Sequence, residues 1–189
     1  VARLSTKPWR MSALISSYTH IPMDSLLGGA DIFHATDHLL PRLNRTRSVF
    51  TLHDLAFLRL PQTHLPLNRW FLTLMMPRFL RQADAIISVS QYTKGDAVRF
   101  YGLDESRITV IPEGVHPRFH PVQEPEILSA VRARYSLPER FILFVSTIEP
   151  RKNLVALWET YRTLLTEGRS EKLVVVGKRG WLDQPIFAR

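Results

Sequence analysis

Two adjacent cations before a predicted helix are the residues best suited to chemistry in this sequence. Arg151 and Lys152 precede Asn153, a good N-cap, and the apolar residues that follow recur at the three-and-four spacing of one helix face. Unpaired amides at a helix N-terminus attract anions, and fixed positive charges strengthen that preference. The pattern predicts a diphosphate-binding turn over residues 147–152. Two solvated cations at a helix start explain the spacing equally well.

A strand before this turn and an amphipathic helix after it would hold it in place. Residues 141–145 form an apolar run of five, which predicts a buried strand in a sheet covered on both faces. The sequence contains no glycine-rich phosphate loop of the Walker or dinucleotide-binding type. The prediction of a phosphate site therefore depends on the strand, the basic turn and the helix together.

A second candidate side chain, His53, directly follows a strand predicted at residues 48–52. Ligands of open parallel sheets bind at the carboxyl ends of the strands, so a histidine there would face a cleft. The alternative is a structural histidine capped by Asp54. His34 and His38 are four residues apart, but the preceding strand and a following proline argue against the helix that a zinc pair would need. We therefore predict no metal site.

The composition is that of a globular chain with a basic surface. Of its 189 residues 45% are hydrophobic, and 25 Lys and Arg against 17 Asp and Glu give a formal charge of +8. The absence of cysteine excludes disulfides and fits a reducing compartment. Because the cations are spread out and do not interleave with aromatic residues, we predict no nucleic-acid partner. No apolar run approaches the roughly 20 residues that span a bilayer, so we predict a cytoplasmic protein.

Prolines and a glycine break regular structure between residues 112 and 125, as is typical of a linker. We predict a first domain over residues 1–118, a linker over 119–125 and a second domain over 126–189. Strand and helix patterns alternate on both sides of the linker, which predicts an α/β fold.

Residues 65–82 carry methionine, leucine and aromatic residues at helical spacing, with Arg69, Arg78 and Arg81 among them. A basic amphipathic helix can dock on an anionic membrane. Ordinary core packing is the more common use of such a stripe and remains open. Pro77 predicts a kink or a break in this helix.

Several segments of the sequence resemble segments of one enzyme family. TIEPRKNL resembles the start of the C-terminal domain in retaining glycosyltransferases of family 4, and DIFHATDHLLP and VFTLHDLAF resemble the N-terminal domain of its bacterial members. The resemblance covers about residues 28–182. It implies a GT-B type architecture, in which two Rossmann-like parallel-sheet domains, both incomplete here, bind a nucleotide sugar.

The resemblance implies a retaining glycosyltransferase of the hexosyl or mannosyl kind, acting in cell-envelope polysaccharide or glycolipid synthesis. The co-substrate would be a nucleotide diphosphate sugar, with no cofactor and no metal, and the acceptor would be a saccharide or a lipid-linked hydroxyl. Many members act at the inner membrane face, which implies peripheral membrane contact. The family's late pair of glutamates is missing, so the chain resembles a fragment that we expect to be inactive alone.

The resemblance also assigns roles to single residues. Lys152 matches the lysine that grips the donor diphosphate, with Arg151 and Thr147 beside it, and His53 matches the catalytic strand-end histidine. The remaining positions on the cleft or acceptor side are His34, Asp37, Asp54 and Ser90. For Ser90, helix capping is an equally simple explanation, and the helix that it would start is expected to end at Gly102 in a left-handed C-cap. The family usually has Asn-Gly-Val-Asp where residues 113–116 read EGVH, and these residues receive no role.

Two other functions remain open from the sequence. A non-catalytic basic module would bind RNA or anionic lipid, with a steep dependence on salt. A sugar-nucleotide epimerase would share the GT-B fold and transfer nothing.

Overall fold

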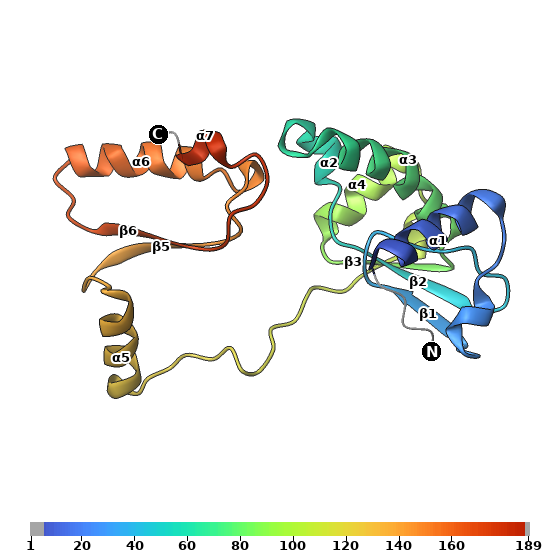
Figure 1. Cartoon of the computed structure of the whole chain (residues 1–189), viewed down its shortest axis with the longest axis horizontal. Coiled ribbons are helices and arrows are strands. Elements are labelled where there is room, and N and C mark those ends of the chain that lie inside the picture. The colour runs from blue at the N-terminus through green and yellow to red at the C-terminus, as the bar shows by residue number, and fades with distance from the viewer. Residues whose placement is uncertain (1–5, 188–189) are drawn as a thin grey trace. The chain divides into compact units, whose positions relative to one another are not determined.

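The structure, a computed structural model, describes residues 6–187. Its contacts divide the chain into two compact units, unit 1 (Val1–Gly114) and unit 2 (Val115–Arg189), which appear at opposite ends of the colour scale in Figure 1. The division falls in the proline-rich stretch, slightly before residue 118, where we predicted the first domain to end.

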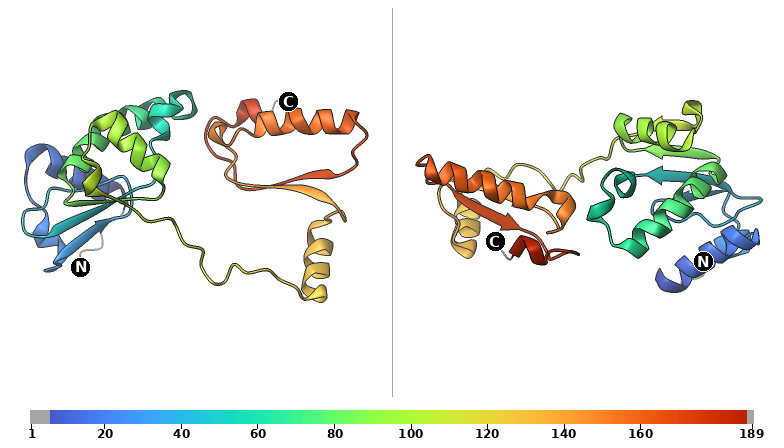
Figure 2. Two further views of the ribbon diagram at one scale, coloured as in Figure 1. Left: turned by 180° about the vertical axis from the view of Figure 1, so that it is seen from behind. Right: turned by 90° about the horizontal axis from the view of Figure 1, so that it is seen from above.

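Unit 1 is built on a four-stranded parallel sheet whose strands stand side by side in chain order. Figures 1 and 2 show helices lying alongside this sheet. The strands are β1 (Ile32–Ala35), β2 (Arg47–Leu52), β3 (Ala85–Ser88) and β4 (Ile108–Val110). The helices are α1 (Thr6–Thr19), α2 (Ala56–Arg59), α3 (Pro66–Gln82) and α4 (Gln91–Tyr101), with short 3-10 turns at Asp24–Leu27, Pro61–Thr63 and Glu105–Arg107.

The core of unit 1 forms where β2 meets α3. Side chains along β2 alternate, and Ser48, Phe50 and Leu52 are buried. Phe50 stacks on Phe79 of α3 with ring centroids 6.5 Å apart, and both are fully buried. Burying an aromatic side chain of this size stabilises a fold by about 1.5–3 kcal/mol, so this contact anchors the sheet to its longest helix.

We predicted a kink or a break at Pro77; α3 runs through this residue without a break, so the second of these alternatives is wrong. A proline inside a helix costs about 3 kcal/mol, and tertiary packing offsets this cost because Met75 and Phe79 on either side are buried. The apolar side chains in the second half of α3 therefore belong to the core, whereas Leu67 and Trp70 in the first half are exposed. None of the described helices is long and apolar enough to cross a bilayer.

The predicted ends of α4 are confirmed. The Ser90 hydroxyl accepts a hydrogen bond from the amide of Thr93 at 3.1 Å, as expected of an N-cap. Gly102 has the left-handed backbone of a C-cap, with φ 62°, and its amide donates to the carbonyl of Val98.

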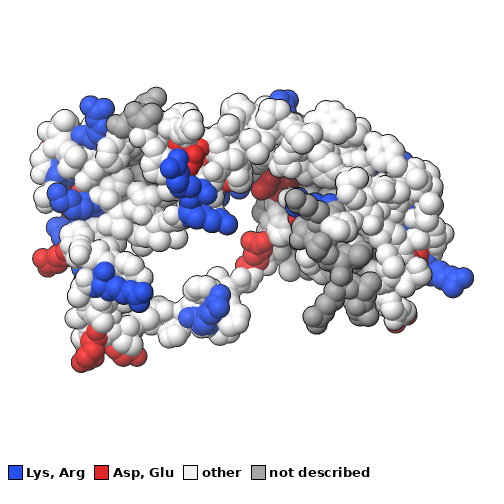
Figure 3. Space-filling model, viewed as in Figure 1, with Lys and Arg blue, Asp and Glu red and all other residues white. Residues whose placement is uncertain are grey.

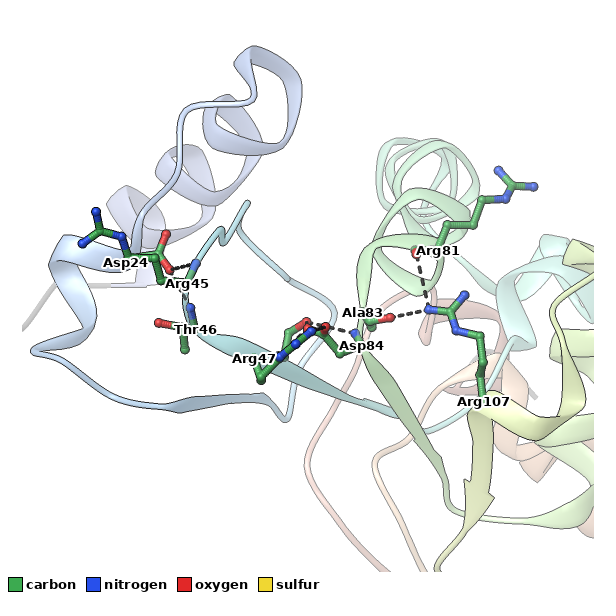
Figure 4. A network of polar contacts seen from close by, with 9 residues as sticks. Asp24, Arg45, Thr46, Arg47, Arg81, Ala83, Asp84 and Arg107 are labelled. Carbon is green, nitrogen blue, oxygen red and sulfur yellow. Dashed lines mark hydrogen bonds and ion pairs between the residues drawn. The ribbon is translucent and has the colours of Figure 1, made fainter.

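A polar network joins the segments that precede the strands of unit 1 (Figure 4). The carboxylate of Asp24 accepts hydrogen bonds from the amides of residues 44–46, the shortest at 2.8 Å. Arg47 pairs with Asp84 at 2.8 Å, and the Asp84 carboxylate also accepts from the Ser48 amide. These contacts tie the amino ends of β2 and β3 together.

The end of α3 is closed by an arginine from much later in the chain. Arg107 donates from Nη2 to the carbonyl oxygens of Arg81, at 3.4 Å, and Ala83 (Figure 4). The last carbonyls of a helix have no partner within the helix. The guanidinium of Arg107 therefore supplies hydrogen-bond donors that α3 itself cannot provide.

Unit 2 has a parallel pair of strands with one helix packed along it (Figure 2). The helix, α6, buries Leu154 and Tyr161, and the Tyr161 hydroxyl donates to the carbonyl of Glu171 at 3.1 Å. The elements are α5 (Pro125–Tyr135), β5 (Phe141–Val145), a 3-10 turn (Pro150–Lys152), α6 (Leu154–Thr166), β6 (Lys172–Val176) and α7 (Gln184–Phe187).

The prediction that the strand at residues 141–145 is covered on both faces is wrong for the described chain. Leu143 and Val145 of β5 are 54% and 67% exposed, and Val176 of β6 is 50% exposed. Since α6 covers one face of the pair, the alternate side chains of β5 stay open to solvent. An apolar run alone does not show whether one face of a strand is covered or both.

Replacing Asp24 should make unit 1 less stable at neutral pH and less sensitive to acid. Burial opposes ionisation of Asp24, but the hydrogen bonds from the amides of residues 44–46 outweigh it and hold the pKa well below the usual aspartate range. A depressed pKa in the folded state stabilises the fold above about pH 4, and the gain is lost as the pH falls further. Urea unfolding of Asp24→Asn should therefore show a lower midpoint than wild type at pH 7, with the difference shrinking below pH 4.

Asp31→Asn is the matched control, because the Asp31 side chain accepts none of these three bonds. An equal loss of stability in both variants at pH 7 would contradict the account of Asp24.

Candidate functional site

Parallel pairing brings the polar residues of unit 1 to one edge of its sheet. β1 and β2 pair in register, with His34 opposite Val49, so the residues that follow both strands meet at the same edge. His34 Nε2 lies 2.7 Å from the hydroxyl of Thr51. We name the side chains at this edge the strand-end cluster: His34, Asp37, His38, His53 and Asp54.

The carboxylates of the strand-end cluster also organise local backbone. Asp54 accepts a hydrogen bond from the amide of Ala56 at 2.9 Å, which starts α2. Asp37 accepts from the amide of His38 at 2.7 Å and lies 4.0 Å from Arg10 of α1. Ser90, predicted near the same cleft, uses its hydroxyl to cap α4, so the capping explanation is confirmed for it.

His38 faces an apolar hollow next to the strand-end cluster. Burial lowers the pKa of His38; Asp37 and Asp54 act against this, and His53 and Arg10 add to it. The side chain is therefore neutral at pH 7. The hollow has a volume of about 520 Å³ and is lined mainly by apolar residues from α1 and the start of α3.

The ring of His53 has a partner that the sequence analysis missed. Its Nδ1 lies 3.1 Å from Oε1 of Glu113, and its Nε2 lies 3.1 Å from the carbonyl oxygen of Thr36. Glu113 is sixty residues away in the chain but follows β4, whose carboxyl end lies on the same edge of the sheet. The expectation that ligands bind at the carboxyl ends of parallel strands, applied to β4 as well, would have pointed to Glu113.

In unit 2 the loops after β5 and β6 continue the strand ladder beyond the strands. The amide of Ile148 donates to the carbonyl of Lys178 at 2.9 Å, and the amide of Gly180 donates to the carbonyl of Ile148 at 3.0 Å. A Cβ at residue 177 would lie 1.7 Å from the carbonyl oxygen of Ser146. Only glycine fits there, so Gly177 sets how closely the two loops approach.

The two loops enclose a hollow of about 530 Å³. Figure 3 shows Lys and Arg side chains gathered at this end of unit 2. We name it the basic hollow; it is lined by Ser146, Thr147, Glu149, Arg151, Lys152, Lys178, Arg179, Gly180 and Trp181. The structure thus brings the predicted residues Thr147, Arg151 and Lys152 together with cations of the second loop.

The arginines of the basic hollow pair with buried carboxylates. Arg151 Nε lies 3.1 Å from Oε1 of Glu149, whose side chain is only 3% exposed. Arg179 Nε lies 2.6 Å from Oδ2 of Asp183, which raises the pKa of Arg179 and lowers that of Asp183. These pairs hold the loops in shape.

The lysines of the basic hollow differ from its arginines. Within residues 6–187, neither Lys152 nor Lys178 forms an ion pair with a carboxylate, and both are exposed. Their ammonium groups therefore carry the positive charge that an incoming anion would meet.

Asn153 stands at the N-cap of α6 as predicted, but its side chain makes no capping bond. Its backbone is left-handed, with φ 53°, whereas a capping residue is extended and points its oxygen at the first-turn amides. The predicted side-chain cap is therefore wrong, and Asn153 leaves the first amides of α6 uncapped beside Lys152.

Comparisons with known proteins agree with one another. The profile of Glycosyltransferase Family 4 matches residues 4–119. O-antigen chain mannosyltransferase B of Escherichia coli is 26% identical over 157 residues, which is 82% of this chain and 41% of that protein. Serotype-specific mannosyltransferase WbdA of Escherichia coli is 32% identical over 124 residues, which is 64% of this chain and 15% of that protein. The chain thus spans less than half the length of these curated relatives.

A solved structure supports the fold. The crystal structure of a glycosyltransferase from Rickettsia africae ESF-5 covers 100% of this chain with a TM-score of 0.55 at 17% identity, and the match takes in 48% of that protein's chain. Together with the parallel sheets of both units, this likeness confirms the predicted α/β class of GT-B type.

Replacing Gly177 by alanine should disrupt the basic hollow. The new Cβ would collide with a backbone carbonyl, which cannot rotate aside as a side chain can. We expect unit 2 to lose about 1–3 kcal/mol of stability, and hydrogen exchange at the amides of Ile148 and Gly180 to become faster. Gly95→Ala in α4 is the control, because a Cβ there meets nothing within 4 Å. Unchanged exchange in Gly177→Ala would show that the loops do not depend on this contact.

Proposed function

Because the chain belongs to Glycosyltransferase Family 4, we propose that the protein transfers a sugar from a nucleotide diphosphate sugar to a hydroxyl acceptor with retention at the anomeric carbon. The observation that carries this proposal is the basic hollow of unit 2. The names of the relatives make mannose the proposed sugar and an O-antigen-type polysaccharide the proposed acceptor. The comparisons lend no support to an RNA-binding module or an epimerase.

The basic hollow offers a diphosphate two kinds of donor. The ammonium groups of Lys152 and Lys178 supply charge-assisted hydrogen bonds, and the uncapped first turn of α6 supplies amides at the positive end of the helix dipole. Arg151 and Arg179 act mainly by keeping the two loops in place, since each is paired with a carboxylate.

The same groups would lower the barrier to transfer. The bond between the anomeric carbon and the diphosphate oxygen breaks through an oxocarbenium-like transition state, and the bonding electrons leave with the diphosphate. The acceptor oxygen then bonds to the anomeric carbon, and its proton passes to an oxygen of the departing diphosphate. Lys152 and Lys178 stabilise the negative charge that builds on the leaving oxygen. In this proposal they supply the charge that a divalent metal supplies in other transferases.

The strand-end cluster of unit 1 is the proposed site for sugar hydroxyls. His34, Asp37 and Asp54 present ring nitrogens and carboxylate oxygens at one edge of the sheet. Such groups hydrogen-bond hydroxyls and set the orientation of a polar ligand.

Lys152→Ala should weaken the binding of nucleoside diphosphates by more than tenfold, or about 1.4 kcal/mol, because it removes an unpaired cation from the basic hollow. Calorimetric titration with GDP and with UDP, in buffer containing a chelator, measures this directly.

Lys172→Ala is the matched control. It removes the same charge from the amino end of β6, away from the loops that form the hollow, and should leave the dissociation constant within about twofold. Equal weakening by both substitutions would indicate net charge alone, and no weakening by Lys152→Ala would remove the diphosphate site.

We also propose that unit 1 contacts the anionic inner face of the membrane. Leu67 and Trp70 at the start of α3 are 78% and 63% exposed, and Met11 of α1 also lines the apolar hollow and is exposed. Arg10 lines the same hollow and Arg69 lies one residue from Trp70. Exposed apolar side chains flanked by cations suit a surface with anionic headgroups above acyl chains.

Trp70→Ala should reduce the affinity for vesicles that contain phosphatidylglycerol, measured by co-sedimentation, by tenfold or more, because a buried aromatic side chain contributes about 1.5–3 kcal/mol. Trp158→Ala replaces a tryptophan of unit 2 that is 40% exposed and should bind the vesicles as wild type does. Equal binding by wild type and Trp70→Ala, or equal binding to neutral phosphatidylcholine vesicles, would contradict the membrane proposal.

A further inference from the structure

Residues 53–59, which we name the α2 segment, carry His53 and Asp54 and end in a helix too short to be stable alone. This helix, α2, has four residues, whereas isolated helices shorter than about 12–15 residues are marginal in water. The Asp54 carboxylate accepts a hydrogen bond from the amide of Ala56 and so starts the helix. Contacts with other elements must therefore hold the α2 segment, and with it two members of the strand-end cluster, in place.

α4 holds the far end of the α2 segment through a buried carboxylate. Nε of Arg59 donates to Oδ2 of Asp96 at 2.7 Å, and Nη2 of Arg59 donates to Oδ1 of the same carboxylate. The Asp96 side chain is only 6% exposed. The guanidinium also lies over the rings of Tyr92 and Phe100, 4.7 and 5.6 Å from their centroids. Two parallel hydrogen bonds and two ring contacts together fix both the place and the plane of the guanidinium.

α4 also holds the near end of the α2 segment. Oγ1 of Thr93, a buried residue, donates to the backbone carbonyl of His53 at 3.2 Å. Between the two ends, Leu55 and Phe57 are buried in the core of unit 1. The α2 segment is thus attached to α4 by polar contacts at both ends and to the core by apolar packing in the middle.

Apolar packing attaches the α2 segment to the core without a preferred direction, whereas a bidentate pair is directional. We propose that Asp96 is a positioning residue: through Arg59 it fixes the orientation of the α2 segment, and thereby the places of His53 and Asp54 in the strand-end cluster. Asp96 acts through Arg59 and need not touch a ligand, because its carboxylate is buried and both oxygens accept from the guanidinium. The importance of this role for sugar transfer rests on the proposed function of the cluster.

Asp96→Asn tests this role, because it keeps the size of the side chain but turns one acceptor into an N–H₂ group that cannot accept. The amides of Leu58, Arg59 and Leu60 donate to carbonyls at the start of α2, and we would follow their hydrogen exchange by NMR in the whole chain. These three amides should exchange tenfold faster or more, since a hydrogen bond between charged groups is lost. Amides of β2, which open with global unfolding, should change by a smaller factor.

Two further variants keep the test decisive. Arg59→Lys keeps a cation beside Asp96 but loses the planar fork, so it should loosen the same amides even if Asp96→Asn does not fold. Asp84→Asn is the matched control, because this carboxylate pairs with Arg47 at the amino ends of the strands. It should not speed exchange in the α2 segment more than in β2. Exchange in the α2 segment that rises no more than that of β2 in both Asp96→Asn and Arg59→Lys would overturn the proposal.

The ring signals of His53 give a second readout, which a purely stabilising pair would not move. Such a pair changes the population of the folded state but leaves the signals of that state in place. We expect the ¹³C–¹H ring signals, identified from a His53→Gln spectrum, to shift in Asp96→Asn and Arg59→Lys and to stay in place in Asp84→Asn. Unshifted signals in both of the first two variants would contradict the positioning role. No sugar or nucleotide enters these experiments, so their outcome is separate from that of the Lys152→Ala titration.

Discussion

Parallel strand pairing is the constraint on which both candidate sites depend. Because all strands of a parallel sheet run the same way, the segments that follow them emerge at one edge. In unit 1 this edge receives the histidines that follow β1 and β2 and the glutamate that follows β4. In unit 2 the loops after β5 and β6 emerge together, and their cations face one hollow. Residues far apart in the chain become neighbours without any direct sequence signal.

The basic hollow contains two kinds of cation with different roles. Guanidinium groups match the planar geometry of carboxylates, and here Arg151 and Arg179 each bind a carboxylate of the same loop region. Lysine side chains are flexible point charges, and Lys152 and Lys178 remain exposed. For the diphosphate that we propose as its ligand, this difference means that the shape of the hollow would persist when the ligand leaves.

The sequence predicted those features that depend on local chemistry. Ser90 and Gly102 define α4 because capping needs only a hydroxyl and a left-handed glycine, and both are readable from residue type. His53 was predicted to lie at the edge of the sheet because it directly follows a strand, and its contacts place it there. Glu113 was missed because its role exists only after four strands have paired. Asn153 was misjudged because its backbone angle is set by the preceding turn and cannot be read from its side chain.

The closure of α3 by Arg107 bears on how unit 1 forms during synthesis on a ribosome. The carbonyls at the end of this helix receive their guanidinium partner from a residue some twenty-five positions later, next to β4. Until Arg107 has left the exit tunnel, only water can take its place at these carbonyls. Because Arg107 directly precedes β4, one short segment of the chain completes both the sheet and the end of the helix.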